Sequence, residues 1–170
     1  MSRGLGDVYK RQGKLDGLKM CYIGDGNNMA NSLIVGGLKT GMQVSVACPE
    51  GYRPDSRVLD FANNYAGFSM FTEPMEAASG ADVIFTDVWA SMGQEGEAEE
   101  RKKIFGGKYQ VNKELLAVAN SGCMVQHCLP AHRGEEITAD VFESHADEIF
   151  DEAENRLHAQ KAVMVTLMEK

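Results

Sequence analysis

The sequence predicts an α/β fold in which a doubly wound parallel sheet is flanked by helices within a single domain. From Leu18 onward, short apolar runs alternate with longer stretches of helical period, which is typical of parallel strands joined by crossover helices. Each short run is also almost wholly apolar, as a strand covered on both faces should be.

Five short apolar or β-branched runs predict the strands, at residues 19–23, 44–47, 68–71, 83–86 and 124–127. Stretches of helical period predict helices at residues 28–40, 55–65, 73–79, 97–104, 113–119, 139–144 and 152–168. Gly41 can cap the end of the first helix, and Asn112 is a good N-cap. Because no repeat or flexible linker divides the chain, we expect one Rossmann-like domain over residues 13–170.

The two ends of the chain differ from this pattern. The first twelve residues, MSRGLGDVYKRQ, are polar and lack periodicity, so we expect a non-native leader outside the fold. The last predicted helix, residues 152–168, is long and carries apolar side chains at mixed helical spacing. Such a helix needs a wide apolar partner.

Composition excludes several classes of function. The 170 residues carry a formal charge of −8, so there is no broad basic surface for nucleic acid or an anionic membrane. No apolar run approaches the roughly 18 to 20 residues that span a bilayer, and no signal peptide is seen. We therefore expect a cytoplasmic protein.

The four cysteines, at positions 21, 48, 123 and 128, form no CxxC pair and are expected to be free thiols.

The first strand runs into a glycine turn that partly matches a dinucleotide-binding fingerprint. Gly24 and Gly26 supply two of its glycines, but Met29 stands where the third should allow close helix packing. Glu50, after the second strand, could mimic the ribose-binding acid. A simpler interpretation is that one of the asparagines at positions 27 and 28 caps the following helix.

The fourth strand leads into the segment 87–93, Asp-Val-Trp-Ala-Ser-Met-Gly. In an open parallel sheet the ligand crevice lies at the carboxyl ends of the strands, where Asp87 falls. Its carboxylate can pair with a substrate ammonium, and the segment that follows is typical of a binding loop. The next residues are acidic and then basic at i,i+4 spacing, which favours a solvated helix face.

The fifth strand runs into His127-Cys128-Leu129-Pro130. Adjacent cysteine and histidine could form a nucleophile with its base, or two metal ligands. However, neighbouring strand residues point to opposite faces, and zinc needs further ligands that the spacing does not supply. If the Leu129–Pro130 bond is cis, the turn could present consecutive backbone carbonyls to the crevice. Arg156, in an acidic segment, is either a surface ion-pair partner or a guanidinium for a carbonyl or phosphate oxygen.

Four segments together resemble the ornithine carbamoyltransferases in order and spacing: Gly-Asp-Gly-Asn-Asn at 24–28, residues 87–93, His-Cys-Leu-Pro at 127–130, and Glu-Asn-Arg at 154–156. The resemblance covers about residues 15–168. It implies that ornithine is bound by Asn28, Asp87, Ser91 and Met92. Asp87 would hold the α-ammonium, and the Ser-Met-Gly loop would close over the substrate.

The resemblance also implies a reaction. Cys128 and Leu129 would contact carbamoyl phosphate at its carbamoyl group, and Arg156 would bind the carbamoyl oxygen. With Asp87, Cys128 and Arg156 as catalytic residues, the ornithine δ-amine attacks the carbamoyl carbon, giving citrulline and phosphate in arginine metabolism. That chemistry needs a neutral amine and a stabilised oxyanion. No metal or organic cofactor is implied.

The family's phosphate-binding motifs, Ser-Thr-Arg-Thr-Arg and His-Pro-Thr-Gln, belong to an N-terminal domain that this chain does not contain. The fragment alone is therefore expected to be inactive, and the apolar face of helix 152–168 is expected to be exposed. The family forms homotrimers largely through that other half.

An aspartate carbamoyltransferase would need cationic groups where the Asp87 loop is acidic, whereas a putrescine or acetylornithine enzyme would leave Asp87 without its α-ammonium. The remaining alternative is a non-catalytic module that binds an amino acid or a nucleotide.

Overall fold

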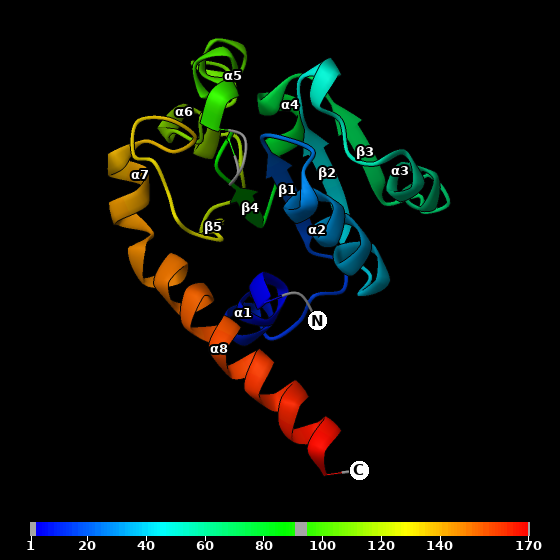
Figure 1. The fold of residues 1–170 in the computed structure, drawn as a ribbon. Helices are drawn as coiled ribbons and strands as arrows, with labels where there is room; N and C mark the ends of the chain where they lie inside the picture. The colour runs from blue at the N-terminus through cyan, green and yellow to red at the C-terminus, as the bar shows by residue number, and fades with distance from the viewer. Residues whose placement is uncertain (1–2, 91–94, 170) are drawn as a thin grey trace.

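The computed structural model describes residues 3–90 and 95–169 and contains one five-stranded sheet (Figure 1). Its strands are all parallel and lie in the order β3-β2-β1-β4-β5. They are β1 (Lys19–Ile23), β2 (Gln43–Ala47), β3 (Phe68–Phe71), β4 (Val83–Thr86) and β5 (Met124–His127). The predicted α/β class is confirmed, and only β2 differs from its expected limits, by beginning one residue earlier.

Helices cover both faces of the sheet, as a doubly wound fold requires. They are α1 (Arg3–Gln12), α2 (Asn28–Lys39), α3 (Ser56–Ala62), α4 (Pro74–Ala78), α5 (Ala98–Phe105), α6 (Lys113–Leu116), α7 (Ala139–Ser144) and α8 (Ala146–Met168), with 3-10 turns η1 (Glu50–Tyr52) and η2 (Glu95–Glu97). In β1, Met20 and Tyr22 pack into the core beneath α1, α2 and α3, whereas Cys21 and Ile23 pack into the core beneath α4 to α8. This alternation is the two-residue period of a strand buried on both faces.

Residues 3–12 form helix α1, so the expectation that they take no part in the fold was wrong. Leu5 and Val8 are fully buried in the core that α2 shares. Asp7 is also buried, and its carboxylate accepts hydrogen bonds from Gln126 Nε2 at 2.9 Å and Asn155 Nδ2 at 3.1 Å. The burial of Asp7 raises its pKa. That the segment is non-native stays a prediction.

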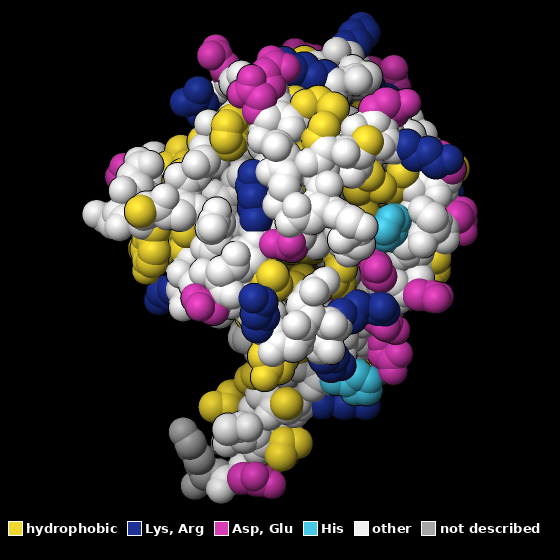
Figure 2. Space-filling view, turned by 180° about the vertical axis from the view of Figure 1, so that it is seen from behind, with side chains coloured by type: hydrophobic (Ala, Val, Ile, Leu, Met, Phe, Trp, Pro, Cys, Tyr) yellow, Lys and Arg dark blue, Asp and Glu magenta, His cyan; other side chains and the backbone are white. Residues whose placement is uncertain are grey.

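Helix α8 begins at Ala146, before the expected start at residue 152, and extends past α1 beyond the body of the domain (Figure 1). Ile149 is buried, whereas Val163 and Leu167 are 58% and 66% exposed. The predicted exposed apolar face is confirmed, and Figure 2 shows apolar side chains gathered on the projecting part. Among the described residues, no helix combines the length and apolar character needed to cross a membrane.

Candidate active site

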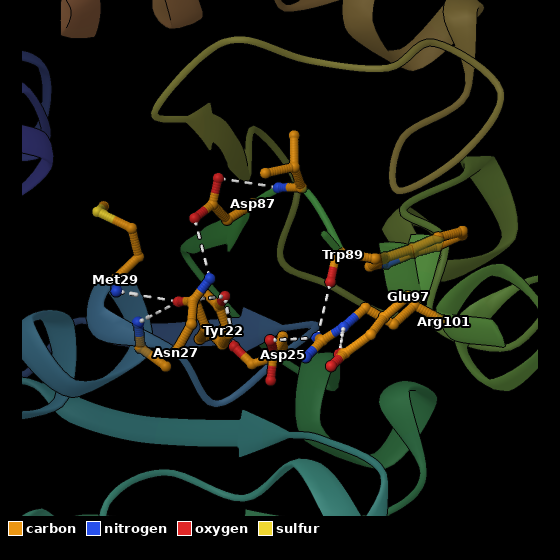
Figure 3. Close-up of polar contacts among 10 residues, drawn as sticks. Tyr22, Asp25, Asn27, Met29, Asp87, Trp89, Glu97 and Arg101 are labelled. Atoms are coloured by element: carbon orange, nitrogen blue, oxygen red, sulfur yellow. Dashed lines mark hydrogen bonds and ion pairs between the residues drawn. The ribbon is translucent and has the colours of Figure 1, made fainter. Parts of the chain in front are cut away.

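Asp87 is a buried carboxylate at the carboxyl edge of the sheet, directly after β4, and is only 6% exposed. Its Oδ1 accepts hydrogen bonds from the Val88 amide at 2.8 Å and from Cys128 Sγ at 2.9 Å. Its Oδ2 accepts a hydrogen bond from Asn27 Nδ2 at 3.2 Å (Figure 3). Because β1, β4 and β5 are neighbours in the sheet, the segments after them meet at this carboxylate and fix its orientation.

Asn27 links the start of α2 to this carboxylate. Its Oδ1 accepts hydrogen bonds from the amides of Met29 at 2.9 Å and Ala30 at 3.4 Å, which is N-cap geometry. The same side chain donates to Asp87 through Nδ2. Asn27 is therefore the cap that the sequence left undecided, whereas the Asn28 side chain is exposed, and the ornithine-binding role of Asn28 stays a prediction.

A buried histidine and glutamate hold the turn after β5. The Leu129 amide donates to His127 Nδ1 at 3.0 Å, so this nitrogen is an acceptor. The other ring nitrogen, Nε2, must then carry the proton that it shares with Glu136 Oε1 at 3.0 Å. Glu136 Oε1 also accepts the His132 amide at 2.6 Å, and both His127 and Glu136 are fully buried. The Leu129–Pro130 bond is cis, the isomer that the sequence left open.

The arrangement bears on the metal and nucleophile alternatives. Asp87, His127 and Cys128 each offer one potential ligand atom, and these atoms lie within 4.8 Å of one another. Both ring nitrogens of His127 are nevertheless used, by Leu129 and Glu136. A metal ion on His127 would have to displace one of these hydrogen bonds, and so would a proton transfer from Cys128. The geometry instead favours a site that uses the Cys128 thiol and the Asp87 carboxylate together.

The glycine turn after β1 packs against protein rather than leaving room for a phosphate. The Gly26 amide donates to the Tyr52 carbonyl at 2.8 Å. A Cβ at Gly26 would lie 2.3 Å from the Arg53 carbonyl carbon and 2.3 Å from Pro54 nitrogen. Gly26 is therefore needed for close contact with the segment after η1.

Replacing Gly26 by alanine is expected to lower the free energy of unfolding by about 1–3 kcal/mol, because backbone atoms must shift to admit the methyl group. Chemical denaturation of the purified chain measures the loss. Gly51→Ala is the matched control, since a Cβ there meets nothing within 4 Å. Equal losses in the two variants would contradict the packing role.

Charge at the same turn also disfavours a nucleotide. Asp25 is buried and faces Arg101, whose Nη1 lies 2.7 Å from Asp25 Oδ2. Burial raises the pKa of Asp25, and the hydrogen bond from Arg101 opposes that shift. Asp87 is a second carboxylate at this edge, while Glu50 lies exposed on η1. Because Arg101 neutralises Asp25, it is the Asp87 carboxylate, whose donors are neutral, that would repel a pyrophosphate and attract a cation.

The four cysteines differ in accessibility. Burial raises the pKa values of Cys21, Cys48 and Cys123 to about 12, and these thiols are buried and free. Cys128 is partly exposed. Because the thiolate is the reactive form, we expect iodoacetamide to label Cys128 in the native chain and the other three only after unfolding. Mass spectrometry of the native and unfolded chains tests this; rapid native labelling of a second cysteine would contradict it.

The remaining residues implied by the resemblance are less closely placed. Ser91 and Met92 lie outside the described residues. Arg156 is exposed on α8, and no hydrogen bond or ion pair joins its guanidinium to the described part of the chain. The structure thus brings together Asp87 and Cys128, with Leu129 in the adjoining turn, and the role of Arg156 stays a prediction.

Two side chains of this region were not found from the sequence. The residues around Glu136 form no recognisable motif. Only the folding of the turn after β5 brings Glu136 to its partner His127. Arg101 was assigned to a solvated helix face by its spacing from Glu97. That ion pair is present at 3.1 Å, but Arg101 is buried at 6% exposure, so this part of the interpretation was wrong.

Comparison with known proteins identifies relatives along nearly the whole chain. The family profile described as aspartate/ornithine carbamoyltransferase, Asp/Orn binding domain, matches residues 16–167. The ornithine carbamoyltransferase of Thermococcus kodakarensis is 54% identical over 166 residues, covering 95% of this chain and 52% of that protein. The anabolic ornithine carbamoyltransferase of Pyrococcus furiosus is 52% identical over 166 residues, with coverage of 95% and 52%.

Solved structures agree with these relatives. The ornithine carbamoyltransferase of P. furiosus superposes with a TM-score of 0.85 at 50% identity, covering 96% of this chain and 54% of that one. The anabolic enzyme of Campylobacter jejuni gives a TM-score of 0.89 at 36% identity, covering 99% and 58%. The chain thus spans about half the length of the curated relatives it matches. It belongs to the aspartate/ornithine carbamoyltransferase family, as a homologue of the Asp/Orn-binding domain of ornithine carbamoyltransferase.

Proposed function

We propose that this chain is the ornithine-binding half of an ornithine carbamoyltransferase. The observation that carries the proposal is the buried Asp87 carboxylate, held by Asn27, Val88 and Cys128 at the carboxyl edge of the sheet. All three of these donors are neutral, so the negative charge is left for a substrate cation. An α-ammonium group is the cation that an amino-acid substrate would present.

In the proposed reaction the δ-amine of ornithine attacks the carbamoyl carbon of carbamoyl phosphate. A C–N bond forms, the bond from that carbon to the phosphate oxygen breaks, phosphate leaves with the electron pair, and the amine loses a proton. Asp87 fixes the other end of ornithine, with Asn28, Ser91 and Met92 as further contacts. Cys128, Leu129 and Arg156 hold the carbamoyl group and stabilise the developing oxyanion.

The phosphate is proposed to bind to the half of the enzyme that this chain does not match. The exposed apolar face of α8, with Leu157, Val163 and Leu167, would pack against that half (Figure 2). A homotrimer and a cytoplasmic location are also proposals. A solved relative that is 31% identical is described as a mitochondrial ornithine carbamoyltransferase from Coccidioides immitis.

Citrulline formation tests the proposal. The chain is assayed with ornithine and carbamoyl phosphate, alone and after mixing with the part of the P. furiosus enzyme that it does not match; we call this the complemented mixture. We expect citrulline from the complemented mixture only, with ornithine preferred over aspartate and putrescine. Binding of a dinucleotide by the chain, with no response to ornithine in either assay, would reject the proposal in favour of a non-catalytic module.

A further inference from the structure

Arg101 is a buried cation beside the site to which the proposed reaction gives no role. Its Nη1 donates to Asp25 Oδ2 at 2.7 Å and to the Trp89 carbonyl oxygen at 2.9 Å. Its Nε donates to Glu97 Oε2 at 3.1 Å (Figure 3). A guanidinium at 6% exposure is desolvated, so these contacts determine where the segments around it can lie.

Arg101 contacts both of the chain segments whose side chains form the hydrogen bond between Asn27 and Asp87. Asp25 precedes Asn27 by two residues in the turn after β1, and Trp89 follows Asp87 by two residues after β4. One guanidinium therefore joins the two segments whose side chains meet at 3.2 Å. The strands themselves are joined at their ends, where Thr86 Oγ1 donates to the Ile23 carbonyl oxygen at 2.9 Å, so loss of the guanidinium would loosen the two segments beyond that point.

The guanidinium also lies over the ring of Tyr52, which belongs to an aromatic cluster. Its Cζ lies 4.9 Å from the centre of the Tyr52 ring. Tyr52 packs edge-on against Phe105 with ring centres 4.9 Å apart, and Trp89 stacks on Phe105 at 5.8 Å. A planar group that donates in several directions while facing a ring is specific to arginine, and lysine can reproduce only part of it.

Arg101 also gives the two carboxylates at this edge different roles. Asp25 is neutralised by Arg101, whereas Asp87 receives neutral donors from Asn27 and Cys128. With Asp25 already paired, Asp87 is the carboxylate left for an incoming cation. Without the guanidinium, Asp25 would compete for the same ammonium.

We propose that Arg101 is a positioning residue for the amino-acid site: its guanidinium sets the spacing of Asn27 and Asp87 and reserves Asp87 for the substrate ammonium. The substrate part of this inference rests on the proposed function. The geometric part does not, because it concerns contacts within this chain.

The first test uses no substrate. Cys128 Sγ donates to Asp87 at 2.9 Å, so the rate at which iodoacetamide alkylates Cys128 reports whether Asp87 is in place. We expect Arg101→Gln to raise that rate about tenfold, because a released thiol ionises more readily. Arg101→Lys should lie between this variant and the unchanged chain. Protection of Cys21, Cys48 and Cys123 in the same sample shows that each variant is folded.

The second test measures ornithine kinetics in the complemented mixture. A shift in the position of a binding carboxylate weakens substrate binding before it affects chemistry. We expect Arg101→Gln to raise the KM for ornithine about tenfold with a smaller change in kcat, and Arg101→Lys to recover part of the loss. Arg57→Gln is the control, since Arg57 forms an exposed ion pair with Asp55 on α3 and should leave both parameters unchanged.

A folded Arg101→Gln chain with unchanged Cys128 alkylation and unchanged KM would overturn the inference; equal exposure of all four thiols means that the variant has not folded. If Arg101→Gln does not fold, Asp25→Asn removes the main partner of Arg101 and is judged by the same two readouts. An inactive complemented mixture with the unchanged chain would count against the proposed function alone, because alkylation still decides the geometric part.

Discussion

Replacing Asp87 by asparagine is expected to lower kcat/KM for ornithine in the complemented mixture by roughly 30-fold to several thousand-fold. Removing one partner of a buried charge pair costs about 2–5 kcal/mol, and every 1.4 kcal/mol is about a factor of ten. Asparagine has the same shape, and its carbonyl can still accept the hydrogen bond that Cys128 gives to Asp87. Its amide nitrogen would face the Asn27 Nδ2 donor in place of Asp87 Oδ2, so the loss would report the missing negative charge together with that one hydrogen bond, and not a collapsed site.

Asp60→Asn is the matched control for this variant. Asp60 is an exposed carboxylate on α3, so its replacement changes the net charge of the chain equally without touching the site. Steady-state kinetics of the two variants are compared at the same ionic strength, because long-range attraction of a cationic substrate is screened by salt. A comparable loss in both variants would mean that Asp87 acts only through the overall acidity of the domain.

Replacing Glu136 by leucine is expected to cause the largest loss of stability. Glu136 accepts hydrogen bonds from His127 Nε2 and from the His132 amide, and leucine can accept neither. Each buried donor left without an acceptor costs about 1–3 kcal/mol. Urea denaturation should show the corresponding fall in the free energy of unfolding, and Cys128 in the adjoining turn should become more reactive toward iodoacetamide.

Two variants separate this effect from a general response to mutation. Glu136→Gln keeps an acceptor oxygen and should lose much less stability. Glu135→Leu changes the neighbouring residue, whose ion pair with Lys102 at 2.9 Å is partly exposed, and exposed pairs contribute about 0–1 kcal/mol. If Glu135→Leu were as destabilising as Glu136→Leu, the buried His127–Glu136 pair would not be what holds the turn.

The sheet could be predicted from the sequence because its strands are buried on both faces and appear as short apolar runs. The structure of the two ends of the chain was harder to predict. Of the described side chains of α1, only Leu5 and Val8 lie in the core that α2 shares, so the segment is mostly polar in sequence although its helix packs against the domain. In α8 the acidic residues at 151–154 resemble a first helical turn. The sequence therefore predicted a helix start near residue 152, whereas the helix begins at Ala146.

The site was predictable only where topology determines it. Asp87 follows a central strand, so its place at the carboxyl edge follows from the parallel sheet. The choice between Asn27 and Asn28 depends on the backbone at the start of α2, where Asn27 is extended, with φ −74° and ψ −166°. The contacts of Glu136 and Arg101 depend on how turns and helices fold back onto the sheet edge. This arrangement cannot be predicted from the neighbouring residues in the sequence.

The central claim, that Asp87 holds the α-ammonium of ornithine, is tested most directly by comparing ornithine with 5-aminopentanoate. This analogue keeps the reacting amine but lacks the α-amino group. In the complemented mixture, kcat/KM for both substrates is measured with the unchanged chain and with Asp87→Asn. We expect the substitution to cost much less with 5-aminopentanoate, giving a coupling energy of about 2 kcal/mol between Asp87 and the α-amino group. The same fold loss with both substrates would contradict the claim and place Asp87 in some other role.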